Sequence, residues 1–157
     1  MSLLPFFQWL ETTRLSEAMS ASVWAFAVVE MFHLLALAML GGTVLILNLR
    51  LLGLRLQRRP VAEVTRELSP YLFASLAVLI FSGALLVIDG PLRYYGNAAF
   101  RLKMLLLAVA IAYSFTLHRR VLHSENDGLI PRARAAAVIS LMLWLSVGLA
   151  GRAIGFI

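Results

Sequence analysis

A glutamate and a histidine interrupt one of the most apolar stretches of this chain. Glu30 and His33 lie within AFAVVEMFHLLALAMLGGTVLILNL, which is long enough to cross a bilayer. Ionisable side chains are costly in hydrocarbon, so those found there usually face a bundle interior and have a partner or a ligand. Residues three apart, as these are, share one face of a helix. We therefore expect both side chains to face the same neighbouring helices.

The spacing of these two residues allows several kinds of chemistry. Imidazole ligates iron, copper and zinc, and Glu-x-x-His also occurs in carboxylate-bridged di-metal bundles. A di-metal site needs about four carboxylates, whereas Glu30 and Asp89 are the carboxylates that this sequence offers near the spans. The chain has no cysteine, which excludes thiolate metal sites and disulfides. No Ser-His-Asp arrangement, phosphate loop or Rossmann fingerprint is present.

Composition places the chain in a membrane. Of its 157 residues, 61% are hydrophobic and 14% charged, well away from the balance of soluble domains. The length predicts a single membrane domain, residues 1–157. A net charge of +6 is better explained by arginines that flank spans than by nucleic-acid binding, since no soluble basic domain remains to carry such binding.

Apolar runs and their breakers predict an all-α, up-down four-helix bundle. Ser69-Pro70 reads as the N-cap and first helical position of the second span, Asp89-Gly90-Pro91 ends that span, and Asn97 caps the third. Residues 1–20 lack the basic start of a signal peptide and predict a short helix lying in the interface, or an ordinary cap on the bundle. The predicted spans are about 23–52, 71–88, 100–117 and 135–154.

Arginine placement predicts the orientation in the membrane. The connections after the first and third spans hold most of the arginines, and the positive-inside rule makes both connections cytoplasmic. Both termini, and the interfacial helix over residues 1–20, are then periplasmic in a multi-pass protein of the bacterial inner membrane. The arginines of the two connections are Arg50, Arg55, Arg58, Arg59, Arg66, Arg119, Arg120, Arg132 and Arg134.

Several polar residues of the predicted spans are expected at similar depths in the membrane, which predicts one candidate site. When the midpoints of the spans are aligned, Glu30 lies roughly 12 Å outward of the midplane, at the level of Lys103 and Arg152. His33 lies about one turn deeper. Three interpretations stay open: a salt-bridge cluster that joins helix ends, cations that extend to the interface, or a site for an anionic or metal-bearing ligand.

Haem b fits the third interpretation. His33 would ligate the iron, Lys103 and Arg152 would hold the propionates, and Glu30 would orient His33 or balance charge. A quinone or a small anion would use the same residues. The sixth ligand would be water, Met39, a residue of another chain, or nothing. Small residues at this depth would leave room, namely Ser82, Gly83, Ala84, Ser146, Gly148 and Gly151.

His118 is the other apparent ligand, and its depth argues against pairing with His33. The two lie roughly 18 Å apart along the membrane normal, whereas the axial nitrogens of one haem lie close to one level. We expect His118 and His123 to belong to the cytoplasmic interface, together with Arg119 and Arg120.

Several segments resemble a known type of protein. They are His33-Leu-Leu-Ala-Leu-Ala-Met-Leu-Gly41, Asn48-Leu-Arg-Leu-Leu-Gly53, Phe100-Arg-Leu-Lys103, Trp144 and Gly151-Arg152. They resemble a bacterial family of small four-helix membrane proteins whose first helix reads HLLGLAxxxG followed by DLRLLG, and which has no assigned activity. Asn48 replaces the acidic residue of that family. More distantly, the chain is similar to CopD-type membrane domains and b-type cytochromes. The resemblance implies that His33, Lys103 and Arg152 occupy recurrent positions.

The sequence thus supports three hypotheses. The first is a b-type haem protein that transfers electrons near the periplasmic face, with a redox partner. The second is a non-catalytic accessory or assembly subunit of a larger membrane complex, and the third is a CopD-like metal-handling or small transport protein. Gly151-x-x-x-Gly155 permits close helix packing and hence a homo-oligomer.

Overall fold

The computed structural model describes residues 3–54, 58–122 and 130–156, and every regular element in these ranges is a helix. Four of the helices are long and apolar enough to cross a membrane: α3 (Val23–Leu51), α4 (Val61–Ile88), α6 (Ala98–Leu122) and α7 (Ile130–Ala153). Only 11% to 22% of the most apolar window of each helix is buried in the protein. Most apolar side chains therefore face outward, which fits a multi-pass membrane protein.

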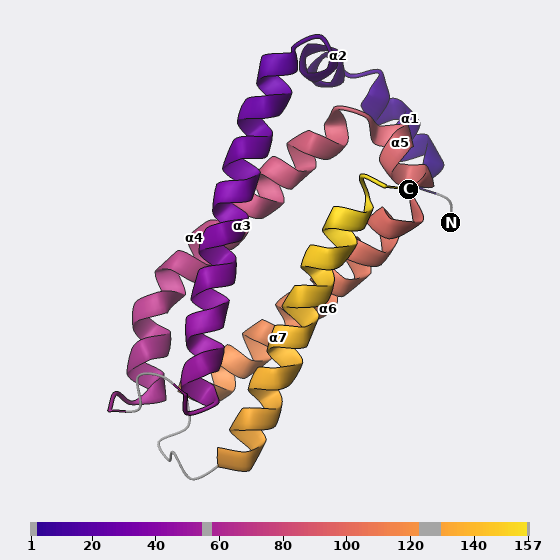
Figure 1. Cartoon of the computed structure of the whole chain (residues 1–157). Coiled ribbons are helices and arrows are strands. Elements are labelled where there is room, and N and C mark those ends of the chain that lie inside the picture. Colours follow the sequence, from indigo (N-terminus) through magenta and orange to yellow (C-terminus); the bar gives the residue numbers. More distant parts are fainter. Residues whose placement is uncertain (1–2, 55–57, 123–129, 157) are drawn as a thin grey trace.

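The four long helices form two antiparallel hairpins (Figure 1). α3 packs mainly on α4 and α6 on α7, and the hairpins meet through α3 with α7 and α4 with α6. Three short helices, α1 (Leu4–Glu11), α2 (Arg14–Ser20) and α5 (Pro91–Gly96), gather at one end, here called the cap end. The opposite end, where α3 leads to α4 and α6 to α7, is called the arginine end. The all-α, up-down four-helix bundle is confirmed.

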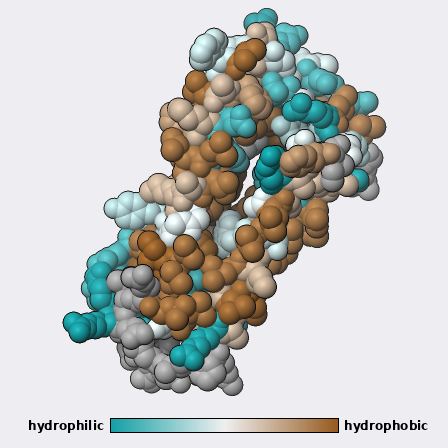
Figure 2. Space-filling view, viewed as in Figure 1, coloured by the Kyte–Doolittle hydropathy of each residue, from teal (hydrophilic) through white to brown (hydrophobic). Residues whose placement is uncertain are grey.

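The core lies where the two hairpins cross. Its buried centre is formed by α3 and α4, and half-buried residues of α6 and α7 pack against it. Trp144, in the middle of α7, is one of these, and its Nε1 donates to Ser114 Oγ at 3.1 Å. In Figure 2, hydrophobic residues cover the middle of the visible face of the protein, and hydrophilic residues gather nearer its ends. The central cluster is Leu40, Val44, Leu72 and Leu76.

The second span starts earlier than predicted. Ser69-Pro70 is not a helix start, because α4 begins at Val61 and Pro70 lies inside it. Proline in a helix interior costs about 3 kcal/mol, and burial of the preceding turns offsets this cost. Val64 and Thr65, in those turns, are only 2% and 4% exposed. α7 likewise begins at Ile130, before the predicted start near 135.

Other helix ends agree with the sequence. Asn97 Oδ1 accepts a hydrogen bond from the Phe100 N–H at 3.0 Å, as the predicted cap of the third span should. α4 ends at Ile88, directly before Asp89-Gly90-Pro91. A short helix, α5, runs over Pro91–Gly96 and was not predicted from the sequence.

The N-terminal segment forms two helices where one was predicted. Thr13 separates them and caps α2, accepting from the Ser16 N–H at 3.3 Å. The segment is tied to the bundle, because the rings of Phe7 and Tyr95 lie 5.1 Å apart and Ser20 Oγ donates to the Asp89 carbonyl at 3.0 Å. It therefore packs across the cap end of the protein.

Candidate functional site

His33 is held by a serine of the neighbouring helix. Its Nδ1 lies 2.8 Å from Ser82 Oγ, and its side chain is half-buried between α3 and α4. Ser82 Oγ has one hydrogen, which it donates to the Val78 carbonyl at 2.6 Å. While this hydrogen is engaged the hydroxyl can accept from His33, in the tautomer that carries its proton on Nδ1. In that tautomer the lone pair is on Nε2, the nitrogen through which imidazole could then ligate a metal.

Gly83 brings the ring close to the backbone of α4. A Cβ at this position would lie 3.3 Å from His33 Cε1, tighter than an ordinary contact. Two consecutive residues of α4 thus fix the imidazole, one by a hydrogen bond and one by the absence of a side chain. Both were singled out in the sequence as small residues at this depth, but their role as partners of His33 was missed.

Lys103 is the cation that the bundle brings to His33. Its aliphatic end lies along Gly151 of α7, where a Cβ would be 3.4 Å from its Cε and 3.5 Å from its Nζ. Its ammonium group is close enough for its charge to act on the His33 ring. All four long helices therefore contribute to one place, here called the His33 site: His33 from α3, Ser82 and Gly83 from α4, Lys103 from α6, and Gly151 from α7.

Glu30 and Arg152 are not drawn into this site. Glu30 is exposed and forms no ion pair with Lys103 or Arg152, all three of which the structure describes. The salt-bridge cluster that sequence depth suggested is thus not formed among these residues. A three-residue step leaves Glu30 turned about 60° from His33 on α3, enough for one side chain to face α4 and the other to face outward.

Arg152 extends toward the end of its own helix. Its guanidinium lies 4.4 Å from the centre of the Phe156 ring, and its Nη1 would be 3.7 Å from a Cβ at Gly155. A long cationic side chain near a helix end commonly behaves in this way. Depth alone therefore placed Arg152 at the right level but not in the right direction.

Comparison with known families identifies relatives without a known activity. The model of a family of unknown function, DUF6644, matches residues 6–157. The chain belongs to this family. A search of curated proteins finds no match for it, and a search of solved structures finds none either. Membership of DUF6644 agrees with the resemblance to a family lacking an assigned activity, whereas similarity to CopD-type domains or b-type cytochromes stays a prediction.

The DUF6644 chain shows no multi-residue metal cluster in its described ranges. Groups of three or more histidine, cysteine, aspartate or glutamate side chains do not occur there. A di-metal centre built on Glu30-x-x-His33 therefore finds no further ligands among these residues. Haem makes no such demand, because the porphyrin supplies four ligands and the protein one or two.

His118 forms a second histidine–serine pair nearer the arginine end. Its Nε2 lies 3.3 Å from Ser69 Oγ, which donates to the Thr65 carbonyl at 2.5 Å. Ser69 and Ser82 are thirteen residues apart on α4, about 20 Å along the helix. The structure thus supports the depth argument that one haem does not bind both histidines. His123, predicted beside His118, lies outside the described residues.

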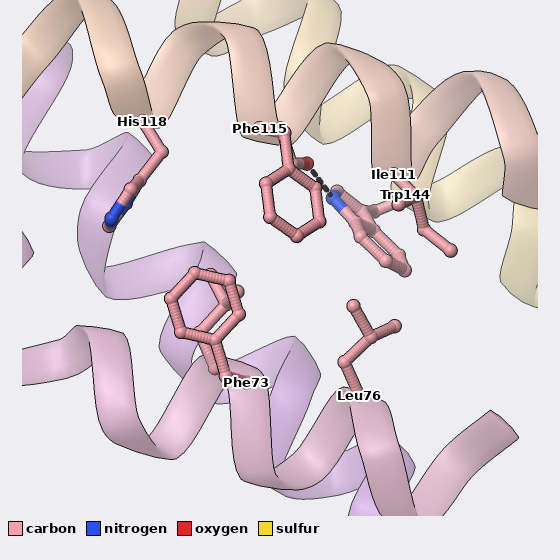
Figure 3. A pocket seen from close by; sticks show the side chains of 8 residues that line it. Phe73, Leu76, Ile111, Phe115, His118 and Trp144 are labelled. Carbon is pink, nitrogen blue, oxygen red and sulfur yellow. Dashed lines mark hydrogen bonds between the residues drawn. The ribbon is translucent and has the colours of Figure 1, made fainter. Parts of the chain in front are cut away.

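A cleft lies beside His118 between α4 and α6 (Figure 3). Its volume is about 10 Å³, room for no more than about one water-sized group. We call it the His118 cleft. Its walls are apolar and aromatic, and the rings of Phe73 and Phe115 lie 5.5 Å apart across it. The side chains labelled in Figure 3 are Phe73, Leu76, Ile111, Phe115, His118 and Trp144.

Proposed function

We propose that this DUF6644 protein is a membrane-embedded b-type haem protein that transfers electrons. The observation that carries the proposal is the state of His33. Its Nδ1 is hydrogen-bonded to Ser82 at 2.8 Å, which leaves Nε2 as the nitrogen for a metal, and Lys103 lies nearby. Buried imidazoles that ligate metals are oriented in this manner by a hydrogen bond on their other nitrogen.

The residues of the His33 site fit the chemistry of haem b. A neutral imidazole nitrogen suits haem iron, and an ammonium group suits a propionate carboxylate. The glycines of the site, Gly83 and Gly151, let the His33 ring and the Lys103 side chain lie against the backbones of α4 and α7. Arg152 would have to leave Phe156 to reach a propionate, at a cost of about 1 kcal/mol.

Each protein residue then has a defined task. Bound haem would supply one-electron oxidation and reduction at its iron. His33 would hold the iron through Nε2, and Ser82 and Gly83 would keep the imidazole plane fixed. Lys103 would offset the negative charge of a propionate in a medium of low dielectric constant. The sequence suggested that Glu30 orients His33 or balances charge; in this arrangement Ser82 would orient the ring.

An absorbance spectrum tests the proposal directly. The protein, produced in cells with sufficient haem and purified in detergent, should show a Soret band and α and β bands that sharpen on reduction. A pyridine haemochrome assay should give stoichiometric haem b. A flat visible spectrum at full protein concentration would reject the proposal and favour the accessory-subunit hypothesis, which co-purification of further chains would then test.

We further propose that the arginine end faces the cytoplasm of a bacterial cell and the cap end faces the periplasm. The support is charge, because the connections at the arginine end and the helix ends that flank them together hold most of the arginines. The His33 site would then lie in the periplasmic half of the inner membrane. The chain has no cysteine, so single-cysteine variants Gln8→Cys and Arg58→Cys report topology cleanly. An impermeant thiol reagent should label only the first in intact spheroplasts; the reverse result would invert the orientation.

A further inference from the structure

We propose that copies of this chain associate side by side in the membrane, with Glu30 of one copy bound to Arg101 of the next. Both side chains are exposed, and neither forms an ion pair with a residue in the part of the chain that the structure describes. A charge on the lipid-facing side of a span is costly, and an opposite charge from a second molecule offsets that cost. The inference concerns the outer surface of the bundle and does not depend on haem.

The two charges lie at matching levels of the bundle. α3 and α6 both run from the cap end to the arginine end, and His33 of α3 lies near Lys103 of α6. Glu30 precedes His33 by three residues, which places it roughly 4.5 Å closer to the cap end. Arg101 precedes Lys103 by two residues, a shift of roughly 3 Å in the same direction. Copies inserted in the same orientation therefore present Glu30 and Arg101 at similar depth.

The two charges belong to opposite corners of the bundle. α3 packs mainly on α4 and α7, and α6 also packs on α4 and α7, so α3 and α6 lie diagonally across from each other (Figure 1). Arg101 lies nine residues before the fully buried Ala110, about two and a half turns, and so points outward from α6. A contact between two different faces joins copies head to tail, into a ring or a row, and not into a two-fold dimer.

The exposed faces that continue from these charges fit each other. Positions four, seven and eleven residues after each charge share its helix face, and all of them are exposed on both helices. Small residues in these pairs let two backbones approach closely, as helix contacts in membranes require. A Cβ at Gly41 would meet nothing within 4 Å, so the single chain leaves this part of α3 uncovered. The pairs are Leu34 with Leu105, Leu37 with Ala108, and Gly41 with Ala112.

The glycine motif of α7 is less suited to such a contact. The sequence suggested Gly151-x-x-x-Gly155 as a site of association, yet the Lys103 side chain already lies against Gly151. A Cβ at Gly155 would likewise meet Arg152 of the same helix. Side chains of the same chain thus cover this motif, and opposite charges are exposed on α3 and α6 instead.

Cysteine cross-linking in native membranes tests the arrangement, because the chain has no cysteine of its own. In the variant that combines Leu34→Cys with Leu105→Cys, oxidation by copper phenanthroline should link each copy to its neighbours and give a ladder of covalent oligomers. Either substitution alone should give monomers, and co-expression of the two single variants should give products no larger than dimers. Dimers from one single variant would show a two-fold contact and overturn the proposal, as would a double variant without cross-linked products.

Charge reversal tests whether Glu30 and Arg101 hold the contact. In the double-cysteine chain, Glu30→Arg or Arg101→Glu places like charges together and should lower the yield of cross-linked product roughly tenfold. The two reversals combined should restore the yield, because the ion pair is then present with its signs exchanged. Glu17→Arg, at an exposed position of α2, is the matched control and should leave the yield unchanged. Failure of the combined reversal to restore the product, or an equal loss in Glu17→Arg, would reject the ion pair.

Discussion

Two histidine–serine pairs lie along α4 and differ in the ring nitrogen that the serine takes. In both pairs the serine donates to the carbonyl four residues earlier and is also hydrogen-bonded to a histidine of another helix. Ser82 binds Nδ1 of His33 at 2.8 Å, whereas Ser69 binds Nε2 of His118 at 3.3 Å. The ring nitrogen that the serine does not take is therefore Nε2 in the first pair and Nδ1 in the second.

This difference separates a potential ligand from a structural histidine. Nε2 lies at the tip of the imidazole, where a large ligand can approach, while Nδ1 lies beside the histidine's own backbone. The surroundings agree, because the His33 ring lies against the bare backbone at Gly83 and the His118 ring lies edge-on to Phe73 at 5.6 Å. Both pairs consist of a histidine and a serine, but only the geometry of the His33 pair leaves a ring nitrogen in a position suited to a large ligand.

The largest expected effect comes from exchanging each histidine for alanine. His33→Ala should abolish stoichiometric haem, because it removes the only protein ligand that we assign. His118→Ala should keep the haem content of the parent protein. The measurement is the ratio of haem, from pyridine haemochrome, to protein. Full haem in purified His33→Ala, or equal loss in both variants, would remove the distinction between the two pairs.

Replacing each serine should change haem affinity less than replacing its histidine does, and again more in the His33 pair than in the His118 pair. Ser82→Ala leaves Nδ1 without its partner and frees the ring, and loss of such an outer contact typically lowers metal affinity about 10- to 100-fold. Ser69→Ala should leave affinity for haem unchanged. Titration of the haem-free protein with haemin gives both affinities. Equal affinities for the two variants would mean that the Ser82 hydrogen bond does not orient the ligand.

Much of the architecture could be predicted from sequence, because it depends on features that are local or additive. Long apolar runs predict spans, and Asn97 predicts a helix start through one side-chain hydrogen bond. The start of α4 could not be predicted in this way. Ser69-Pro70 has the local chemistry of a helix start, and only the tertiary burial of Val64 and Thr65 overrides it.

The depth of the candidate site residues in the membrane could be predicted from the sequence, but the direction in which their side chains point could not. A rise of 1.5 Å per residue brings Lys103 to within about one helical turn of His33, and the structure places the two near each other. Depth says nothing about rotation around the helix axis. Glu30 and Arg152 therefore share the predicted level, yet they face outward and toward Phe156. Ser82 was recognised as small, but its choice of a ring nitrogen needs side-chain geometry.

Adding one methyl group at Gly83 should disturb the His33–Ser82 pair without removing any atom of either residue. In Gly83→Ala the new Cβ would lie 3.3 Å from His33 Cε1, so the ring must move by a few tenths of an ångström. We expect a shifted Soret band and a weaker haem affinity, by roughly tenfold, as for a perturbed outer contact. Gly148→Ala is the matched control, since its Cβ would meet nothing within 4 Å. Identical spectra for both variants would show that the ring does not depend on this close contact.

The smallest effect should come from Lys103, which acts on the site only through charge. A cation near haem stabilises the reduced state relative to the oxidised state, which carries one more positive charge, so Lys103→Gln should lower the midpoint potential. At the distances of a bundle interior the change should be on the order of 50 mV. Spectroelectrochemical titration of the haem-loaded protein measures it, and Arg120→Gln, an exposed position at the far end of the same helix, is the control. An unchanged potential in Lys103→Gln, with haem content intact, would place the ammonium group too far from the iron to act, and the charge beside His33 would then have a structural role.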